Sequence, residues 1–179
     1  MIIVVDLCSE PLSRSEFVNP ILSAVRGQGK AEPFHYHELG PELLEGAERV
    51  ILSGSPLADR EQLEQMEAFE WLKDFDRPVL GICAGFQLLG RLYGSKMVEN
   101  VEIGMTEIKT SAENPLFSEN FQAYALHGLA VEPSGELEVL ARSATCVQAF
   151  KHKEMSHYGV LFHPEVRNRE ILTRFCQIW

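Results

Sequence analysis

The stretch that decides the fold reads Pro78-Val79-Leu80-Gly81-Ile82-Cys83-Ala84-Gly85-Phe86-Gln87-Leu88-Leu89-Gly90. Residues 78–82 form a short apolar run, which is typical of a strand buried on both faces of a parallel sheet. An apolar helix follows, and Cys83 stands at the tight turn between the two in the pattern G-x-C-x-G. Small residues at Gly81 and Gly85 relieve the crowding that such a turn creates.

This turn predicts that Cys83 is a nucleophile. It places the sulfur at the amino end of a helix, whose dipole and free N–H groups favour a thiolate and can stabilise an oxyanion. The alternative is a buried core cysteine beside a glycine turn, since most free cysteines are inert packing residues. The glycines on both sides of Cys83 favour the role of nucleophile over that of a packing residue.

A cysteine nucleophile needs a base, and residues 158–166 supply a candidate at the end of another predicted strand. Pro164 holds His163 in extended geometry, so the imidazole can project from the strand end. Glu165 can hold one imidazole nitrogen protonated and leave the other to exchange a proton with the sulfur. Taken alone, His163 could be an ordinary strand-end histidine and Glu165 a helix-start carboxylate. Together with Cys83, the pair favours catalysis.

The rest of the chain predicts a single α/β domain over residues 1–179. Apolar runs predict strands at residues 2–5, 31–36, 49–53, 78–82, 101–109, 137–141, 147–151 and 158–162, and helices at 19–27, 60–72 and 167–179. In the first helix, Asn19 is expected to cap and Pro20 to occupy the first helical position. The alternation in the first half indicates a mostly parallel central sheet with helices on both faces, and some strands of the second half are expected to be antiparallel.

Composition excludes several function classes. The 179 residues are 45% hydrophobic, which suits one compact core. A formal net charge of -10 repels phosphate backbones, so we expect no nucleic-acid partner. No apolar stretch approaches the ~20 residues of a membrane span, and the opening run is too short for a signal peptide. We therefore expect no membrane association and a cytosolic location.

The cysteine and histidine spacing predicts no metal. Four cysteines are far apart in the sequence without a C-x-x-C pair. His35 and His37 would share one face of a strand, but no third ligand at sensible spacing accompanies them, so they are expected to be ordinary strand histidines. The other three cysteines, Cys8, Cys146 and Cys176, are expected to be core or surface thiols that do not label selectively.

The motifs G-x-C-x-G-x-Q and H-P-E together resemble those of the class I, or triad, glutamine amidotransferases. The similarity runs through nearly the whole chain, including the turn Leu52-Ser53-Gly54-Ser55-Pro56. The resemblance implies that Cys83, His163 and Glu165 form the catalytic triad. It implies that the backbone of Ala84 and of the Gly54-Ser55 turn donates to the oxyanion. It also implies that the substrate contacts Gln87 and the backbone of residues 126–129, including Gly128 and Leu129. Alternatively, Gln87 and His127 are exposed or capping polar residues.

Within the family, the resemblance is closest to the stand-alone glutaminase subunit of GMP synthase, with three departures. Ser55 stands where many relatives have a second glycine, which restricts the orientation of an oxyanion donor and suggests reduced or conditionally switched activity. Leu129 replaces an aspartate that is common in GMP synthase relatives. Residues 167–170 form a shorter link into the last helix than is usual in the family.

The resemblance implies a glutaminase that hydrolyses the side-chain amide of L-glutamine through a cysteine thioester, without a cofactor. Ammonia released into water would be protonated, so such domains usually dock a synthetase that uses it at once. A Walker motif is absent from the sequence, so the synthetase is expected to be a separate chain. Two alternatives are a free-standing hydrolase of γ-glutamyl amides or peptides and a weakly active glutamine-binding regulatory module.

Overall fold

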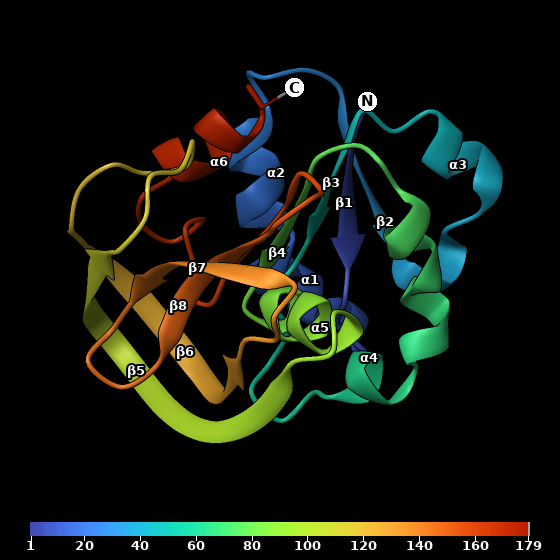
Figure 1. The fold of residues 1–179 in the computed structure, drawn as a ribbon. Helices are drawn as coiled ribbons and strands as arrows, with labels where there is room; N and C mark the ends of the chain where they lie inside the picture. Colours follow the sequence, from blue (N-terminus) through green and yellow to red (C-terminus); the bar gives the residue numbers. More distant parts are fainter. Residues whose placement is uncertain (179) are drawn as a thin grey trace.

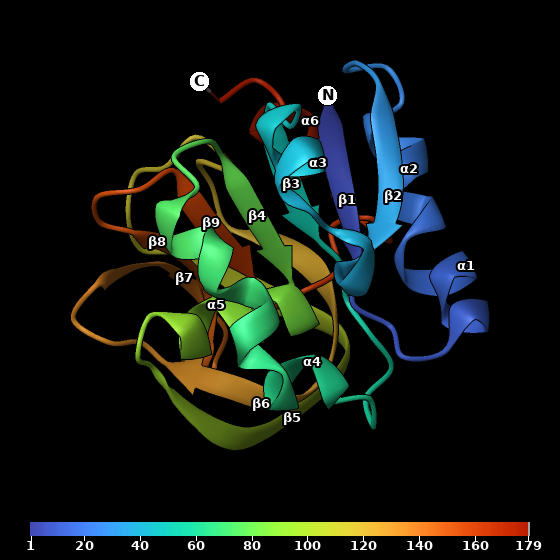
Figure 2. The same ribbon diagram turned by 90° about the vertical axis from the view of Figure 1, so that its right-hand side faces the viewer.

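The computed structural model describes residues 1–178. In this part of the chain, nine strands form one sheet in the order β2-β1-β3-β4-β9-β8-β7-β5-β6. Figures 1 and 2 show the sheet running through the middle of the molecule, with the strands of the N-terminal half at one end and a strongly curved β5–β6 hairpin at the other. The predicted α/β class, with helices on both faces of a mixed sheet, is confirmed.

The parallel half of the sheet contains the strands that the apolar runs predict. These are β1 (Ile2–Asp6), β2 (Ala31–His35), β3 (Arg49–Leu52), β4 (Val79–Ile82) and β9 (His157–Val160). Each neighbouring pair is parallel, and β4 lies between β3 and β9. Strands β1, β3, β4 and β9 are buried along their whole length, which explains why apolar residues predominate in β1, β3 and β4.

The other half is antiparallel, as expected. It contains β5 (Lys96–Thr110), β6 (Phe121–Glu132), β7 (Leu137–Arg142) and β8 (Val147–His152). The prediction omitted β6, because Ala123, Ala125 and Ala130 on this strand are small and give it no β-branched apolar run. Pairing with the long β5 makes residues 121–132 a strand all the same.

Helices cover both faces of the sheet, and two cores separate them from it. Side chains alternate along β1, so Ile3 and Val5 enter one core and Ile2 and Val4 the other. The first core is shared with α3 (Pro41–Glu45), α4 (Glu61–Glu64), η3 (Met66–Asp74) and α5 (Ala84–Leu92), and the second with α2 (Asn19–Val25) and α6 (Glu170–Phe175). The remaining turns are η1 (Pro11–Ser13), α1 (Arg14–Phe17) and η2 (Tyr36–Glu38). The described helices include none with the length and apolar character that a membrane span requires.

The helix ends differ from the prediction in three places. Asn19 makes no side-chain cap, because α1 has already brought Val18 into helical backbone and Asn19 is the first residue of α2. The expected helix at 60–72 is interrupted at Gln65 (φ -110°, ψ 44°) and continues as the 3-10 helix η3. The last helix begins at Glu170 rather than at residue 167, since Asn168 has a φ of 70° that breaks the helix. Its predicted end, Trp179, lies outside the described residues.

Candidate active site

Cys83 sits on a strained turn between β4 and α5. Its φ of 48° and ψ of -96° lie where residues with a side chain are rarely found. The two flanking glycines permit close approaches of the backbone. A Cβ on Gly81 would lie 2.4 Å from the Gly85 backbone, and a Cβ on Gly85 would lie 2.7 Å from the Leu52 carbonyl oxygen. The G-x-C-x-G spacing is therefore required by packing.

Backbone hydrogen bonds fix this turn to both neighbouring strands. The Cys83 N–H donates to the Val160 carbonyl (2.9 Å), and the Gly85 N–H donates to the Ser53 carbonyl (3.2 Å). The thiol thus lies at the carboxyl edge of the parallel strands and at the amino end of α5, where open α/β sheets place their ligand sites. The Ala84 N–H belongs to the first turn of α5, whose N–H groups have no partner within the helix.

His163 and Glu165 follow β9 and reach the same edge. The His163 N–H donates to the Tyr124 carbonyl (2.8 Å), which ties the segment to β6. His163 Nδ1 lies 2.7 Å from Glu165 Oε1, and both side chains are at most 2% exposed. The ring also passes close to the predicted oxyanion turn, because a Cβ on Gly54 would lie 3.0 Å from His163 Cε1.

The carboxylate fixes which nitrogen of His163 faces the thiol. A carboxylate only accepts, so Nδ1 donates to Glu165 and Nε2 is left for another group. Among the described residues, Nε2 has no hydrogen-bond partner. Burial by itself lowers the pKa of His163, but the nearby Cys83 and Glu165 charges outweigh it and hold this pKa well above its usual value. The ring is therefore ready to carry a proton beside a thiolate.

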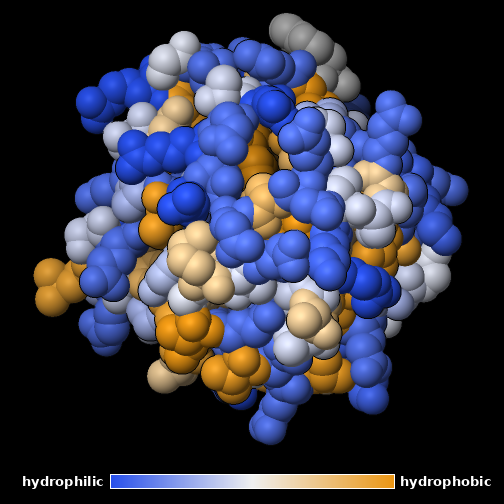
Figure 3. All heavy atoms as spheres, turned by 90° about the vertical axis from the view of Figure 1, so that its left-hand side faces the viewer, coloured by the Kyte–Doolittle hydropathy of each residue, from blue (hydrophilic) through white to orange (hydrophobic). Residues whose placement is uncertain are grey.

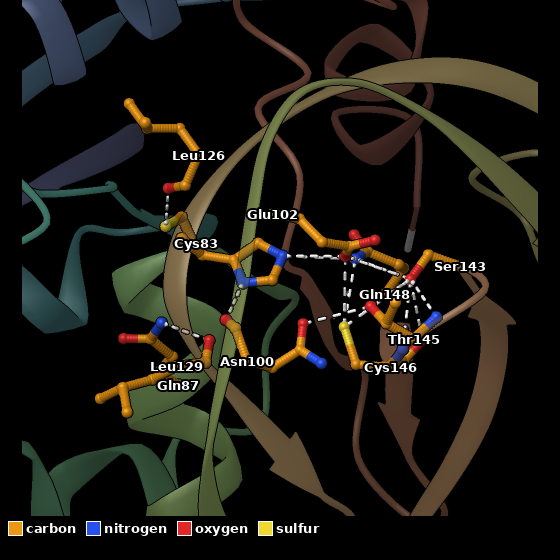
Figure 4. A network of polar contacts seen from close by, with 11 residues as sticks. Cys83, Gln87, Asn100, Glu102, Leu126, Leu129, Ser143, Thr145, Cys146 and Gln148 are labelled. Carbon is orange, nitrogen blue, oxygen red and sulfur yellow. Dashed lines mark hydrogen bonds and ion pairs between the residues drawn. The ribbon is translucent and has the colours of Figure 1, made fainter.

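The Cys83 thiol makes its hydrogen bond to β6 rather than to His163. Its Sγ lies 3.5 Å from the Leu126 carbonyl oxygen on β6, and Figure 4 shows the two atoms facing each other. The three predicted triad residues are thus brought together at one edge of the sheet, with the sulfur turned toward β6.

The predicted substrate residues line a narrow pocket beside the sulfur. Its walls include Ser55, Ala84, Gln87, Gly128 and Leu129. The Gln87 Nε2 donates to the Leu129 carbonyl (3.0 Å) and bridges the pocket from α5 to β6. The cavity holds about 20 Å³, which is space for one or two water molecules. Glutamine can enter only if these walls move apart.

Ser55 directs its hydroxyl toward Asp59 and Gln62. Its Oγ donates to the Asp59 carbonyl (3.3 Å) and accepts from Gln62 Nε2 (3.4 Å). The hydroxyl is therefore tied to the loop that leads into α4. This tie fixes the Gly54-Ser55 turn, whose N–H groups are the second predicted oxyanion donor.

A model of the family described as Glutamine amidotransferase class-I matches residues 15–177. The chain belongs to the class I glutamine amidotransferases. Relatives named as glutamine-hydrolyzing GMP synthase subunits support this: the protein from Methanococcus vannielii is 40% identical over 141 residues, 72% of each chain. The one from Thermoplasma volcanium is 35% identical over 147 residues, 75% of this chain and 73% of that protein.

Solved structures share the amidotransferase fold. The chain matches one described as a GMP synthase subunit from Thermoplasma acidophilum with a TM-score of 0.86 and 25% identity, over 98% of this chain and 92% of that one. A glutamine amidotransferase from Thermotoga maritima matches in fold with a TM-score of 0.73 and 20% identity, over 98% and 80% of the two chains. The expected family, and with it an enzyme, is confirmed.

His127 of this amidotransferase is neither exposed nor a cap. It is fully buried, and its backbone lines the pocket while its ring points away toward Glu102 on β5. Burial lowers the pKa of His127, although the Asn100 carbonyl and Glu102 act in the opposite direction. Glu102 was not predicted as a site residue, because its alternation with Val101 and Ile103 favours the apolar side chains facing inward, whereas the structure leaves these two side chains exposed.

The remaining thiols differ from Cys83 in their surroundings. Burial raises the pKa of Cys8, and it raises the pKa of Cys146 and of Cys176 to about 11. These three are therefore protonated at neutral pH, in line with the prediction that they do not label selectively. Their protonation leaves Cys83 as the candidate nucleophile.

The His35-x-His37 pair is not a strand pair as expected. His35 ends β2, and His37 lies in the 3-10 helix η2, because the capping box of His35 and Glu38 turns the chain there. His35 Nε2 lies 3.1 Å from the Cys8 carbonyl oxygen. The two histidines therefore do not project together from one strand face.

Proposed function

We propose that this amidotransferase hydrolyses the side-chain amide of L-glutamine to glutamate and ammonia. The observation that carries the proposal is the strained Cys83 turn at the edge of the sheet where the buried His163–Glu165 pair also lies. Strain of this kind is kept at functional sites because it aims a side chain. The names of the relatives from Methanococcus and Thermoplasma, which are glutamine-hydrolyzing, support the same substrate.

The first half of the reaction forms a thioester. Cys83 transfers its thiol proton to His163 Nε2 and attacks the amide carbon of glutamine, so that a C–S bond forms and the carbonyl oxygen becomes an oxyanion. Backbone N–H groups of Ala84 and of the Gly54-Ser55 turn donate to this oxygen. The tetrahedral intermediate collapses, the C–N bond breaks, and His163 returns the proton to the leaving nitrogen as ammonia.

The second half regenerates the enzyme. His163 takes a proton from water, the resulting hydroxide attacks the thioester carbon, and the C–S bond breaks to give glutamate. Cys83 regains its proton from His163. Glu165 keeps the imidazole oriented through both halves because it holds Nδ1 at 2.7 Å.

We infer that the ammonia passes to a separate synthetase chain, since the relatives are named as subunits of GMP synthase. An exposed apolar row on β5 supports a docking face: Val101, Ile103 and Met105 are 71%, 65% and 51% exposed. Figure 3 views the side of the molecule that carries β5 and β6 and shows hydrophobic groups among hydrophilic ones.

Four free cysteines suit a reducing compartment, which favours the cytosol.

The narrow pocket supports a glutaminase that is switched on by its partner. Glutamine needs the Gln87–Leu129 bridge to open and the Cys83 thiol to turn from the Leu126 carbonyl toward His163. Leu126 and Leu129 both belong to β6, which pairs with the strand that carries the apolar row. A partner docked on β5 can therefore move both contacts.

The test is to incubate the purified chain with glutamine and to measure glutamate and ammonia, with and without the synthetase chain from the same organism. We expect weak activity alone and a rise in kcat with the synthetase. Cys83→Ala should lower kcat by about 10⁴-fold, whereas Cys176→Ala, a matched buried thiol, should retain it.

Two outcomes would contradict the proposal. Activity that survives Cys83→Ala would exclude the thioester mechanism. Turnover of γ-glutamyl peptides at a higher kcat/KM than glutamine, unchanged by the synthetase, would instead show a free-standing hydrolase.

A further inference from the structure

A second set of cysteine, histidine and glutamate joins β5, β6 and the start of β8, with the histidine buried and the other two partly buried. Glu102 on β5, His127 on β6 and Cys146 before β8 bring one ligand atom each to within 4.8 Å of one another. Glu102 Oε2 lies 3.1 Å from His127 Nε2 and 3.4 Å from Cys146 Sγ. Figure 4 shows the Glu102 side chain of β5 meeting those of Cys146 and Gln148, which both come from the segment at the start of β8.

The Glu102 carboxylate accepts hydrogen bonds from Gln148 Nε2, Ser143 Oγ and Cys146 Sγ, whereas its contact with His127 depends on where the ring carries its hydrogen. His127 Nδ1 lies 3.0 Å from the Asn100 carbonyl, and a carbonyl only accepts, so Nδ1 carries a hydrogen. In the neutral ring Nε2 then has a lone pair, and it faces the Glu102 carboxylate, a second acceptor. A histidine that donates its far nitrogen to a backbone carbonyl is the arrangement that orients metal ligands.

Gln148 adds an independent observation. Its side chain is fully buried, and its Nε2 lies 2.5 Å from Glu102 Oε2 and 3.3 Å from Cys146 Sγ. Its Oε1 has no hydrogen-bond partner among the described residues. Half a turn of the amide exchanges the two atoms and brings an oxygen into the cluster, where it can serve as a fourth ligand.

We propose that Glu102, His127, Cys146 and Gln148 bind a divalent zinc-like cation. With ligand bonds of about 2.0–2.3 Å, the edges of a tetrahedral zinc site are about 3.3–3.6 Å. The separations of 3.1 and 3.4 Å from Glu102 to His127 and Cys146 need only small adjustment, whereas the 2.5 Å between Gln148 and Glu102 must widen by about 1 Å. On binding, the Cys146 S–H bond breaks, its proton leaves to solvent and an S–metal bond forms, so that thiolate and carboxylate balance the two positive charges.

The cation would act on structure rather than on chemistry. It joins β5, β6 and β8 next to the pocket, and His127 is the residue before Gly128 in the pocket wall. A bound cation would therefore hold the β6 wall in one position and oppose its movement.

The experiment titrates Co²⁺ into the full-length Cys83→Ala protein, in which the candidate catalytic thiol cannot supply the sulfur. We expect a thiolate-to-Co²⁺ absorption band that Zn²⁺ displaces, together with a rise in the unfolding temperature. Cys146→Ser should abolish the band, and Glu102→Gln should weaken binding at least tenfold. Cys176→Ser is the matched control and should retain both signals.

No band in the Cys83→Ala protein at millimolar Co²⁺ would overturn the proposal. A band that persists in the further variant Cys146→Ser would do the same, because the sulfur would then come from elsewhere. If Cys146→Ser fails to fold, Glu102→Gln decides: unchanged Co²⁺ affinity in that variant rejects the site.

Discussion

The molecule contains the same three residue types twice, in arrangements suited to different chemistry. In the first set, Cys83, His163 and Glu165, the carboxylate holds Nδ1 and leaves Nε2 for the sulfur, so a proton can pass along the series. In the second set, the Cys146 thiol donates to the Glu102 carboxylate and His127 Nε2 lies 3.1 Å from the same oxygen, so the three groups meet at one point.

The difference shows that the order of partners decides the chemistry, more than the residue types. Cys83 is forced into a φ of 48° at the amino end of α5, which places the sulfur beside N–H groups that can stabilise a developing oxyanion. Cys146 lies just before a regular strand, and burial raises its pKa to about 11, which keeps it protonated without a metal. Three groups in series, which can pass a proton, favour catalysis, whereas three groups that meet at one point favour the binding of a cation.

Exchanging each carboxylate for an amide gives the largest expected effect. Glu165→Gln should lower kcat for glutamine about 10³–10⁴-fold, because an amide can stabilise the wrong tautomer of His163 and removes a charge that raises its pKa. Glu102→Gln should lower kcat less than about tenfold, because it changes only the support of the pocket wall. Steady-state kinetics on both variants with saturating synthetase measures the two losses.

Co²⁺ binding completes this test, since the variant with the smaller loss of kcat should have the larger loss of Co²⁺ affinity. Co²⁺ affinity should fall at least tenfold in Glu102→Gln and stay unchanged in Glu165→Gln. Equal losses of kcat in the two variants would show that the two sets are not separate in function.

A third buried histidine sharpens the comparison because both of its nitrogens already have partners. His157 Nε2 donates to the Phe75 carbonyl (2.9 Å), and Nδ1 accepts from the Tyr93 hydroxyl (2.6 Å). Burial lowers the pKa of His157 to about 4, so this histidine is neutral and has a structural role. We expect it to contribute to pH-dependent stability rather than to catalysis.

The sign follows from proton binding. Below pH 6.5 the unfolded chain binds a proton at residue 157 that the folded protein takes up only near pH 4, so this stabilising contribution is complete above pH 6.5 and is lost as pH falls from 6.5 to 4. The loss is about 3 kcal/mol in the free energy of unfolding. His157→Gln should reduce the pH dependence by that amount in urea unfolding at pH 7 and pH 4. Parallel pH profiles for the two proteins would contradict this assignment.

The sequence was most informative where close packing restricts the residue type. Gly81 and Gly85 are required because any Cβ would meet backbone, and the buried parallel strands need continuous apolar runs, so the Cys83 turn and the central sheet were predictable. The series from Cys83 to His163 and Glu165 was also accessible, since each residue follows a buried strand that ends at one edge.

The second set could not be predicted, because its members meet only through tertiary pairing. Glu102 and His127 come together through the β5–β6 register, which contains a bulge. In addition, β6 has no apolar run from which a strand could be predicted. Helix interruptions such as that at Gln65 were missed for a similar reason: the apolar periodicity continues across the break while the backbone does not.

The smallest expected effect concerns Ser55, which stands in the predicted oxyanion turn where many members of the family have a glycine. The Ser55 hydroxyl holds the turn to Asp59 and Gln62, and its Cβ limits how far the peptide can rotate toward an oxyanion. Ser55→Gly frees the rotation and should raise kcat about threefold to tenfold, well below the full value of one oxyanion donor. Ser55→Ala is the matched control, because it removes the hydroxyl ties and keeps the Cβ. If Ser55→Ala raises kcat as much as Ser55→Gly, the ties rather than the Cβ limit the turn; if neither changes kcat, the second donor of the oxyanion lies outside residues 54 and 55.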